Sequence, residues 1–182
     1  MADGVTGKRV ALLVEDEFED RQVTEGARVL REAGVEVVLV GPIRGRTYRG
    51  RHGEASAEAE LAAGAAKIKD FDGVFVPGGY APDKIRMRHA MVDLVRDATA
   101  TGKPVAAIAH GAQVLISANA LRGRTITCWP SIAVDVKNAG GLYVDRPVVE
   151  DGNLITSRKS DDLPFLCEAL LKALGNVTAD AR

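Results

Sequence analysis

Short apolar runs alternate along the chain with segments of helical periodicity. Four runs are rich in Val, Leu, Ile and Ala, at 9–14, 35–40, 73–77 and 104–109. Runs of this length and composition are typical of parallel strands that are covered on both faces. They predict the central strands of a parallel sheet.

The first helical segment lies between the first two runs, at 20–33. Val23, Ala27 and Leu30 recur there at three- and four-residue steps, and Gly34 follows as a stop signal. Three further segments with helical spacing or helix-start signals predict one helix each, at 82–100, 132–139 and 161–174.

The alternation of strands and helices predicts an α/β three-layer sandwich, with a mostly parallel sheet and helices on both faces. The last third is more mixed, with short strand-like segments at 125–127, 147–150 and 154–157. Asp151-Gly152 reads as a hairpin turn between two of them, and Ser160 as the N-cap of the last helix. Neither a linker nor an internal repeat interrupts the pattern, so we expect a single domain over 1–182 with a core at about 8–175.

Composition narrows the possible partners. Lys and Arg total 24 and Asp and Glu total 25, a net charge of −1, so no global field favours nucleic acid. No apolar run approaches the roughly 18 residues that cross a bilayer, and the first residues lack a signal core, so we expect a cytoplasmic protein without a membrane partner. Cys128 and Cys167 form no CxxC motif and are expected to be buried, reduced thiols.

Polar or glycine-rich segments follow three of the predicted strands. They lie at 15–20, 77–83 and 109–113. Ligands of parallel α/β sheets bind just beyond the carboxyl ends of the strands. We therefore expect these three segments to surround a pocket.

The segment Ala109-His110-Gly111 has the pattern of a nucleophile elbow, in which a strand turns at once into a helix. The amides at the start of that helix would face the site. The same residues also suit a tight connection in which small side chains allow close packing. The segment holds no Ser, Cys or Thr, and His110 is either a general base or a hydrogen-bonded structural imidazole.

The acidic run 15–20 and the glycine pair Gly78-Gly79 are the other candidate elements. Most of the five carboxylates in the run are expected to be solvated at a helix entrance, with one available as an acid or base. Gly78 and Gly79 offer free amides to an oxyanion, or form a plain turn. The Arg-rich stretch 44–51 is interpreted as a solvated loop or hairpin, with an interface as the alternative.

Cofactor motifs are not found. The sequence contains neither GxGxxG nor a Walker motif, and its histidines lack the spacing of metal ligands. We expect no cofactor and no metal.

Several ordered motifs resemble the ThiJ/PfpI superfamily. They are Glu17–Asp20, Val76–Gly79, 102–108, His110-Gly111 and 121–124, and those at 135–140, 155–158 and 161–164 resemble its PfpI-type branch. The resemblance extends roughly from residue 9 to 174. It implies a flavodoxin-like fold, a homo-oligomer (dimer or hexamer), and a Cys–His pair at the elbow with a pocket glutamate and a carboxylate from a neighbouring subunit. Relatives are described as intracellular peptidases, cofactor-free glyoxalases, deglycases and stress chaperones.

The resemblance assigns roles residue by residue. Glu19 matches the pocket glutamate, His110 the catalytic histidine, and Asp83 the inter-subunit carboxylate, as Asp rather than the Glu of some members. Gly79 and the His110 backbone match the oxyanion-hole donors, with Gly78 and Gly111 beside them as further oxyanion- or substrate-binding positions. Trp129 occupies a position that is often Tyr. Ala109 stands where the family carries its nucleophilic Cys, and Cys128, a conceivable substitute, better suits packing.

Three functional hypotheses follow. The first is a PfpI-type hydrolase or glyoxalase/deglycase scaffold for small carbonyl compounds or peptides, inactive in thiol chemistry because a methyl group at Ala109 cannot be a nucleophile. The second is a thiol-independent hydratase, hydrolase or lyase that uses Glu19 and His110 as acid and base. The third is a non-enzymatic binder of small molecules or a stress holdase.

Overall fold

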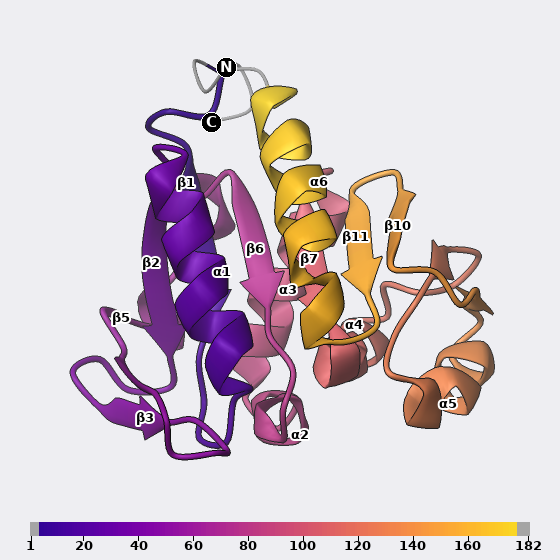
Figure 1. The fold of residues 1–182 in the computed structure, drawn as a ribbon, viewed down its shortest axis with the longest axis horizontal. Coiled ribbons are helices and arrows are strands. Elements are labelled where there is room, and N and C mark those ends of the chain that lie inside the picture. The colour runs from indigo at the N-terminus through magenta and orange to yellow at the C-terminus, as the bar shows by residue number, and fades with distance from the viewer. Residues whose placement is uncertain (1–3, 178–182) are drawn as a thin grey trace.

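The computed structural model describes residues 4–177. Its main sheet consists of β1 (Arg9–Leu13), β2 (Glu36–Gly41), β5 (Leu61–Ala62), β6 (Gly73–Val76), β7 (Val105–Ile108), β10 (Val148–Asp151) and β11 (Leu154–Ser157). The strand order is β10-β11-β7-β6-β1-β2-β5 (Figure 1). Only β10 runs antiparallel to its neighbour. The four predicted apolar runs form β1, β2, β6 and β7, which confirms the mostly parallel sheet.

Helices cover both faces of this sheet. The helices are α1 (Asp20–Glu32), α2 (Ala81–Ile85), α3 (His89–Ala100), α4 (Ala112–Ser117), α5 (Ala133–Asn138) and α6 (Leu163–Gly175). Helices α1 and α6 pack together on the face toward the viewer in Figure 1, and α3 and α4 pack behind the sheet. This arrangement confirms the flavodoxin-like three-layer sandwich.

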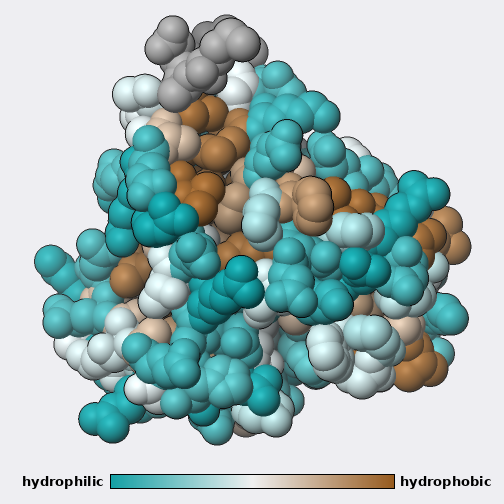
Figure 2. Space-filling view, in the orientation of Figure 1, coloured by the Kyte–Doolittle hydropathy of each residue, from teal (hydrophilic) through white to brown (hydrophobic). Residues whose placement is uncertain are grey.

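The outer surface over α1 and α6 is largely hydrophilic. Hydrophobic side chains are exposed mainly between these two helices, in the upper part of Figure 2. In α1, the apolar Val23, Ala27 and Leu30 are buried, as their spacing predicts. None of the helices in the described part of the chain is both long and apolar enough to cross a membrane.

Two small sheets lie outside the main one. β3 (Thr47–Arg49) and β4 (Ser56–Glu58) form an antiparallel hairpin, so the hairpin interpretation of the Arg-rich stretch is confirmed. β8 (Thr125–Ile126) pairs in parallel with β9 (Leu142–Tyr143). The predicted turn at Asp151-Gly152 is also found, because β10 and β11 are paired there and Gly152 has a φ of +54°.

The prediction of one helix over 82–100 is wrong. The chain forms α2 and α3 instead, and Arg88 between them has extended backbone angles. The Arg88 side chain reaches back to Glu15, with Nε 3.2 Å from Oε2. Glu15 is only 2% exposed, and a buried carboxylate needs such a partner. This long-range ion pair accompanies the break that the local sequence does not signal.

The N-cap assignment of Ser160 is also wrong. Residues Ser160–Asp162 form a 3-10 turn, and the N-cap of α6 is Asp162. The Ser160 hydroxyl instead accepts a hydrogen bond from Gln22 Nε2 at 3.0 Å. The Ser160 side chain therefore makes a tertiary contact with α1 and does not cap the helix that follows it in sequence.

Candidate active site

A pocket of about 320 Å³ opens at the carboxyl ends of four parallel strands. Its walls come from the segments after β1, β6, β7, β8 and β11, together with the β3–β4 hairpin. The lining residues are Glu19, Gln22, Arg51, Gly79, Ala109, His110, Trp129, Lys159, Ser160 and Asp161. Because the strand order reverses direction at β1, the pocket lies at the switch point where such folds bind ligands.

The backbone at Ala109 has the strained geometry of a nucleophile elbow. Its φ is +55°, a value that L-residues with a Cβ adopt at a cost. Close packing holds the bend, since a Cβ on Gly111 would lie 2.6 Å from the Val76 carbonyl oxygen. The Ala109 carbonyl also accepts a hydrogen bond from Trp129 N at 3.2 Å. The elbow backbone is therefore retained although the side chain is a methyl group.

This strain makes a stability prediction. Ala109→Gly is expected to raise the free energy of unfolding by roughly 1 kcal/mol, because glycine adopts positive φ without the Cβ penalty. Chemical denaturation measures the difference. The control is Ala98→Gly in α3, where the same change is expected to cost about 1 kcal/mol. Equal losses in both variants would show that the elbow stores no strain.

His110 lies half-buried beside the elbow. Its ring stacks on the Trp129 indole, with centroids 6.2 Å apart and planes at 28°. Burial, and secondarily the positive charge of Arg51, lower the pKa of His110 below its ordinary 6.5. The imidazole is therefore uncharged at neutral pH and can accept a proton.

The Glu19 carboxylate lines the same pocket, just before α1. Its side chain is 17% exposed. Oε2 lies 3.7 Å from Arg51 Nη1, and Oε1 lies 3.4 Å from His52 Nε2. Arg51 also stacks over the Tyr80 ring at 4.5 Å. The pocket thus combines a carboxylate held beside a cation with a neutral imidazole.

Of the glycine pair, Gly79 lines the pocket and Gly78 packs behind it. Gly78 N donates to Gln22 Oε1 at 2.7 Å, while the Gly79 N–H has no acceptor within residues 4–177. Gly79 has a φ of +81°, and a Cβ there would lie 2.4 Å from the Glu17 carbonyl oxygen. Gly79 therefore lines the pocket with a free amide, which can donate to a negatively charged oxygen.

The expectation that most of the acidic run is a solvated helix entrance needs correction. Glu15 and Asp20 are buried, and Asp16 accepts the Arg49 amide at 3.1 Å and pairs with Arg46. These three carboxylates bind donors from distant segments, namely Arg88 for Glu15, the turn after β3 for Asp20 and Arg49 for Asp16.

Other expected site residues lie outside the pocket of this chain. Asp83 is exposed on α2 and does not line the pocket, while Gly78 and Gly111 pack behind it. Cys128 is fully buried, and burial together with the Asp135 charge raises its pKa to about 12. Such a thiol is not a nucleophile at neutral pH, so the packing interpretation of Cys128 holds.

Sequence reasoning missed several lining residues. They are Arg51, Gln22, Lys159, Ser160 and Asp161. The Arg-rich stretch was a signal for the first, but its pattern did not indicate that the hairpin folds over Glu19. The segment after β11 could have been found by the same rule that selected the ends of the other strands.

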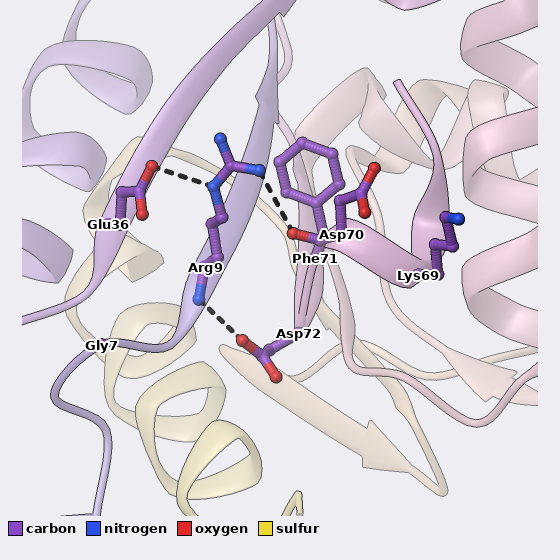
Figure 3. Close-up of a pocket in the computed structure, with 7 residues that line it drawn as sticks. All are labelled: Gly7, Arg9, Glu36, Lys69, Asp70, Phe71 and Asp72. Carbon is purple, nitrogen blue, oxygen red and sulfur yellow. Dashed lines mark hydrogen bonds and ion pairs between the residues drawn. The ribbon is translucent and has the colours of Figure 1, made fainter. Parts of the chain in front are cut away.

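A second cavity, of about 530 Å³, lies at the opposite end of the sheet (Figure 3). Arg9 occupies its wall, with Nε 2.9 Å from Glu36 Oε1 and Nη1 3.3 Å from the Asp70 carbonyl oxygen. The Arg9 amide donates to Asp72 Oδ2 at 2.9 Å. This cavity lies at the amino ends of the strands, away from the switch point, so it is the weaker candidate. Within residues 4–177, no cluster of three or more His, Cys, Asp or Glu side chains could hold a metal ion.

The fold and the elbow define a flavodoxin-like α/β protein with a nucleophile-elbow pocket. Residues 8–173 match the model of the DJ-1/PfpI family, and the chain belongs to that family. It is 43% identical over 169 residues to "Protein/nucleic acid deglycase 2" of Escherichia coli (92% of this chain, 98% of the relative). A deglycase of Pyrococcus horikoshii is 41% identical over 166 residues (91% and 99%).

A solved structure is similarly close. A two-domain protein of Anabaena variabilis, which contains DJ-1/ThiJ/PfpI-like and ferritin-like domains, superposes with a TM-score of 0.90 at 41% identity. The match covers 96% of this chain and 51% of that protein. The resemblance that the motifs indicate is thereby confirmed.

Proposed function

We propose that this chain has the scaffold of a deglycase or glyoxalase that binds small carbonyl compounds, or carbonyl adducts of larger molecules, and that Ala109 keeps it from thiol chemistry. The observation that carries the proposal is the elbow: Ala109 keeps a φ of +55° and lines one pocket with His110 and Glu19. A strand–helix connection that served packing alone would not need a residue with a Cβ at positive φ.

The pocket supplies what addition of a thiolate to a carbonyl requires. With a cysteine at position 109, its sulfur would attack the carbonyl carbon while the carbonyl oxygen becomes negatively charged. The Gly79 N–H faces the pocket without an acceptor in residues 4–177 and would stabilise that oxygen. His110, uncharged at neutral pH, would take the thiol proton.

The relatives' names support the substrate class. Two are named deglycases, and the name of one includes nucleic acid. The balanced charge of this chain, −1 in 182 residues, offers no general attraction for nucleic acid. We therefore propose small carbonyl compounds or peptides as the ligands, and the exclusion of nucleic acid stays a prediction.

We also propose that Asp83 serves the pocket of a neighbouring subunit. Its support is that Asp83 is exposed at the start of α2, close in sequence to Gly79, and is not part of the pocket of its own chain. Light scattering tests the assembly, and a monomer at micromolar concentration would contradict it.

A thiol-independent activity is the second candidate, because Glu19 and His110 both line the pocket. General acid and base groups alone can accelerate a reaction by about 10² to 10⁴. Turnover by the chain as it stands, lost in Glu19→Gln, would favour this candidate over the first.

The test of the main proposal is to install the thiol. Ala109→Cys and the parent chain are compared for consumption of a small dicarbonyl compound and for peptide cleavage. The variant should gain activity over the parent, and equal rates for both chains would contradict the proposal.

A further inference from the structure

The turn between β3 and β4 is fastened to the start of α1 by one carboxylate. Asp20 Oδ2 accepts the His52 amide at 2.9 Å. Its Oδ1 accepts the amides of Glu54 at 2.9 Å and Ala55 at 2.8 Å. Three backbone donors from one turn therefore converge on a single side chain, which is only 4% exposed.

The surroundings of this carboxylate fit it closely. A Cβ on Gly50 would lie 2.2 Å from Asp20 Oδ1, so only glycine allows the approach. Burial by itself raises the pKa of Asp20, but the hydrogen bonds from the three amides, together with one from the Asp20 backbone, more than offset this and the pKa lies below its ordinary value. An amide side chain of the same shape would present an N–H to one of these donors.

The fastened turn carries two side chains that reach the pocket. Arg51 and His52 both approach the Glu19 carboxylate, at 3.7 and 3.4 Å. Glu19 and Asp20 are neighbours in sequence at the start of α1. The Asp20 side chain binds the backbone of the turn, and the Glu19 side chain contacts two side chains of the same turn. One further bond, from Arg51 N to the Phe18 carbonyl at 2.9 Å, joins the same two segments.

We infer that Asp20 is a positioning residue: its carboxylate fixes the 50–55 turn, so that Arg51 and His52 stay on Glu19 and Arg51 stays beside the pocket. A long side chain on an unfastened loop samples many rotamers, and fixing its backbone lowers the entropy cost of holding the charge in place. Asp20 itself does not line the pocket. The inference concerns the chain as it stands and does not depend on the proposed reaction.

The single tryptophan of the sequence makes this testable. Trp129 stacks on His110, and a protonated imidazole quenches a neighbouring indole. Trp129 fluorescence against pH therefore reports the protonation of His110, which His110→Gln should abolish. The charged groups that line the pocket with His110 are Glu19, Arg51, Lys159 and Asp161, and none of them is altered in the variants of Asp20.

Asp20→Asn is expected to raise the midpoint of this titration. Released Arg51 no longer opposes the imidazolium, and the pocket becomes more hydrated. Arg51→Gln should raise the midpoint by roughly half a pH unit, because that is the effect of one charge several ångströms away in a water-like medium. Asp20→Asn should raise the midpoint by the same amount or less, since it displaces Arg51 without removing its charge. Amide hydrogen exchange at residues 52, 54 and 55 should accelerate in the same variant.

The matched control is Asp16→Asn, which removes the same charge from the same acidic run. Asp16 accepts the amide of Arg49, the last residue of β3, but none of the amides of residues 50–55. The midpoint of Asp16→Asn should therefore stay at that of the parent. If Asp20→Asn fails to fold, Glu54→Pro removes one of the three donors from the side of the turn. A midpoint that stays at the parent value in the folded variant, or that moves equally in Asp16→Asn, would overturn the inference.

Discussion

The chain that carries Ala109→Cys is expected to consume a small dicarbonyl compound at least about 10³ times faster than the parent chain, because loss of a covalent nucleophile typically costs several orders of magnitude. The backbone at position 109 already has the positive φ of an elbow, so the new sulfur needs no rearrangement. Loss of the dicarbonyl over time, with and without a thiol-alkylating reagent, measures the gain.

The parent chain is the control for the two cysteines that it shares with the variant. It contains Cys128 and Cys167, whose burial raises their pKa values to about 12 and about 11, and these thiols should neither alkylate nor turn over substrate. In the Ala109→Cys chain, adding His110→Ala should lower the rate by about 10² to 10⁴. A new thiol that alkylates readily but consumes no dicarbonyl would show that the pocket has another purpose.

Gly79→Ala is expected to lower the free energy of unfolding by about 3 kcal/mol, since backbone strain and a clash with fixed atoms add. The added Cβ would lie 2.4 Å from the Glu17 carbonyl oxygen and 2.6 Å from Glu19 N. Both are backbone atoms that cannot turn away. For a chain of this length the loss corresponds to a fall in melting temperature of roughly 10 °C.

A second glycine separates the clash from the strain. Gly102 has a φ of +75°, but an added Cβ there would have nothing within 4 Å. Gly102→Ala should therefore cost only about 1 kcal/mol, the penalty of positive φ alone. Equal melting temperatures for the two variants would mean that the backbone around Gly79 shifts to accommodate the added Cβ.

The central sheet follows from the sequence because its signals are local. Each of the runs that form β1, β2, β6 and β7 is apolar on both faces, and parallel strands between two helix layers require that. The elbow was found for the same reason, since Ala109 and Gly111 are small where a strand turns at once into a helix. The rule that ligands meet the carboxyl ends of strands then brought the segments 15–20, 77–83 and 109–113 together. Within them, the family resemblance singled out Glu19, Gly79 and His110.

Contacts between distant segments could not be predicted in this way. Arg88 finds Glu15 across 73 positions, and Gln22 finds Ser160 across 138. Each pairing depends on where the folded chain places a donor, and nothing in the local pattern of either residue reports its partner. For the same reason the hairpin was recognised while its place over Glu19 was not.

The hairpin that forms one wall of the pocket lies outside the main sheet. β3 and β4 pair with each other, while β2 and β5 on either side of them pair directly in parallel. The register of the sheet therefore does not depend on the segment between β2 and β5, which is held in place by its own contacts with Asp20 and with the backbone of Glu17 and Phe18. A transplanted loop from a relative that keeps the buried Tyr48 and the donors to Asp20 should therefore change which molecules enter the pocket without shifting the register of the sheet.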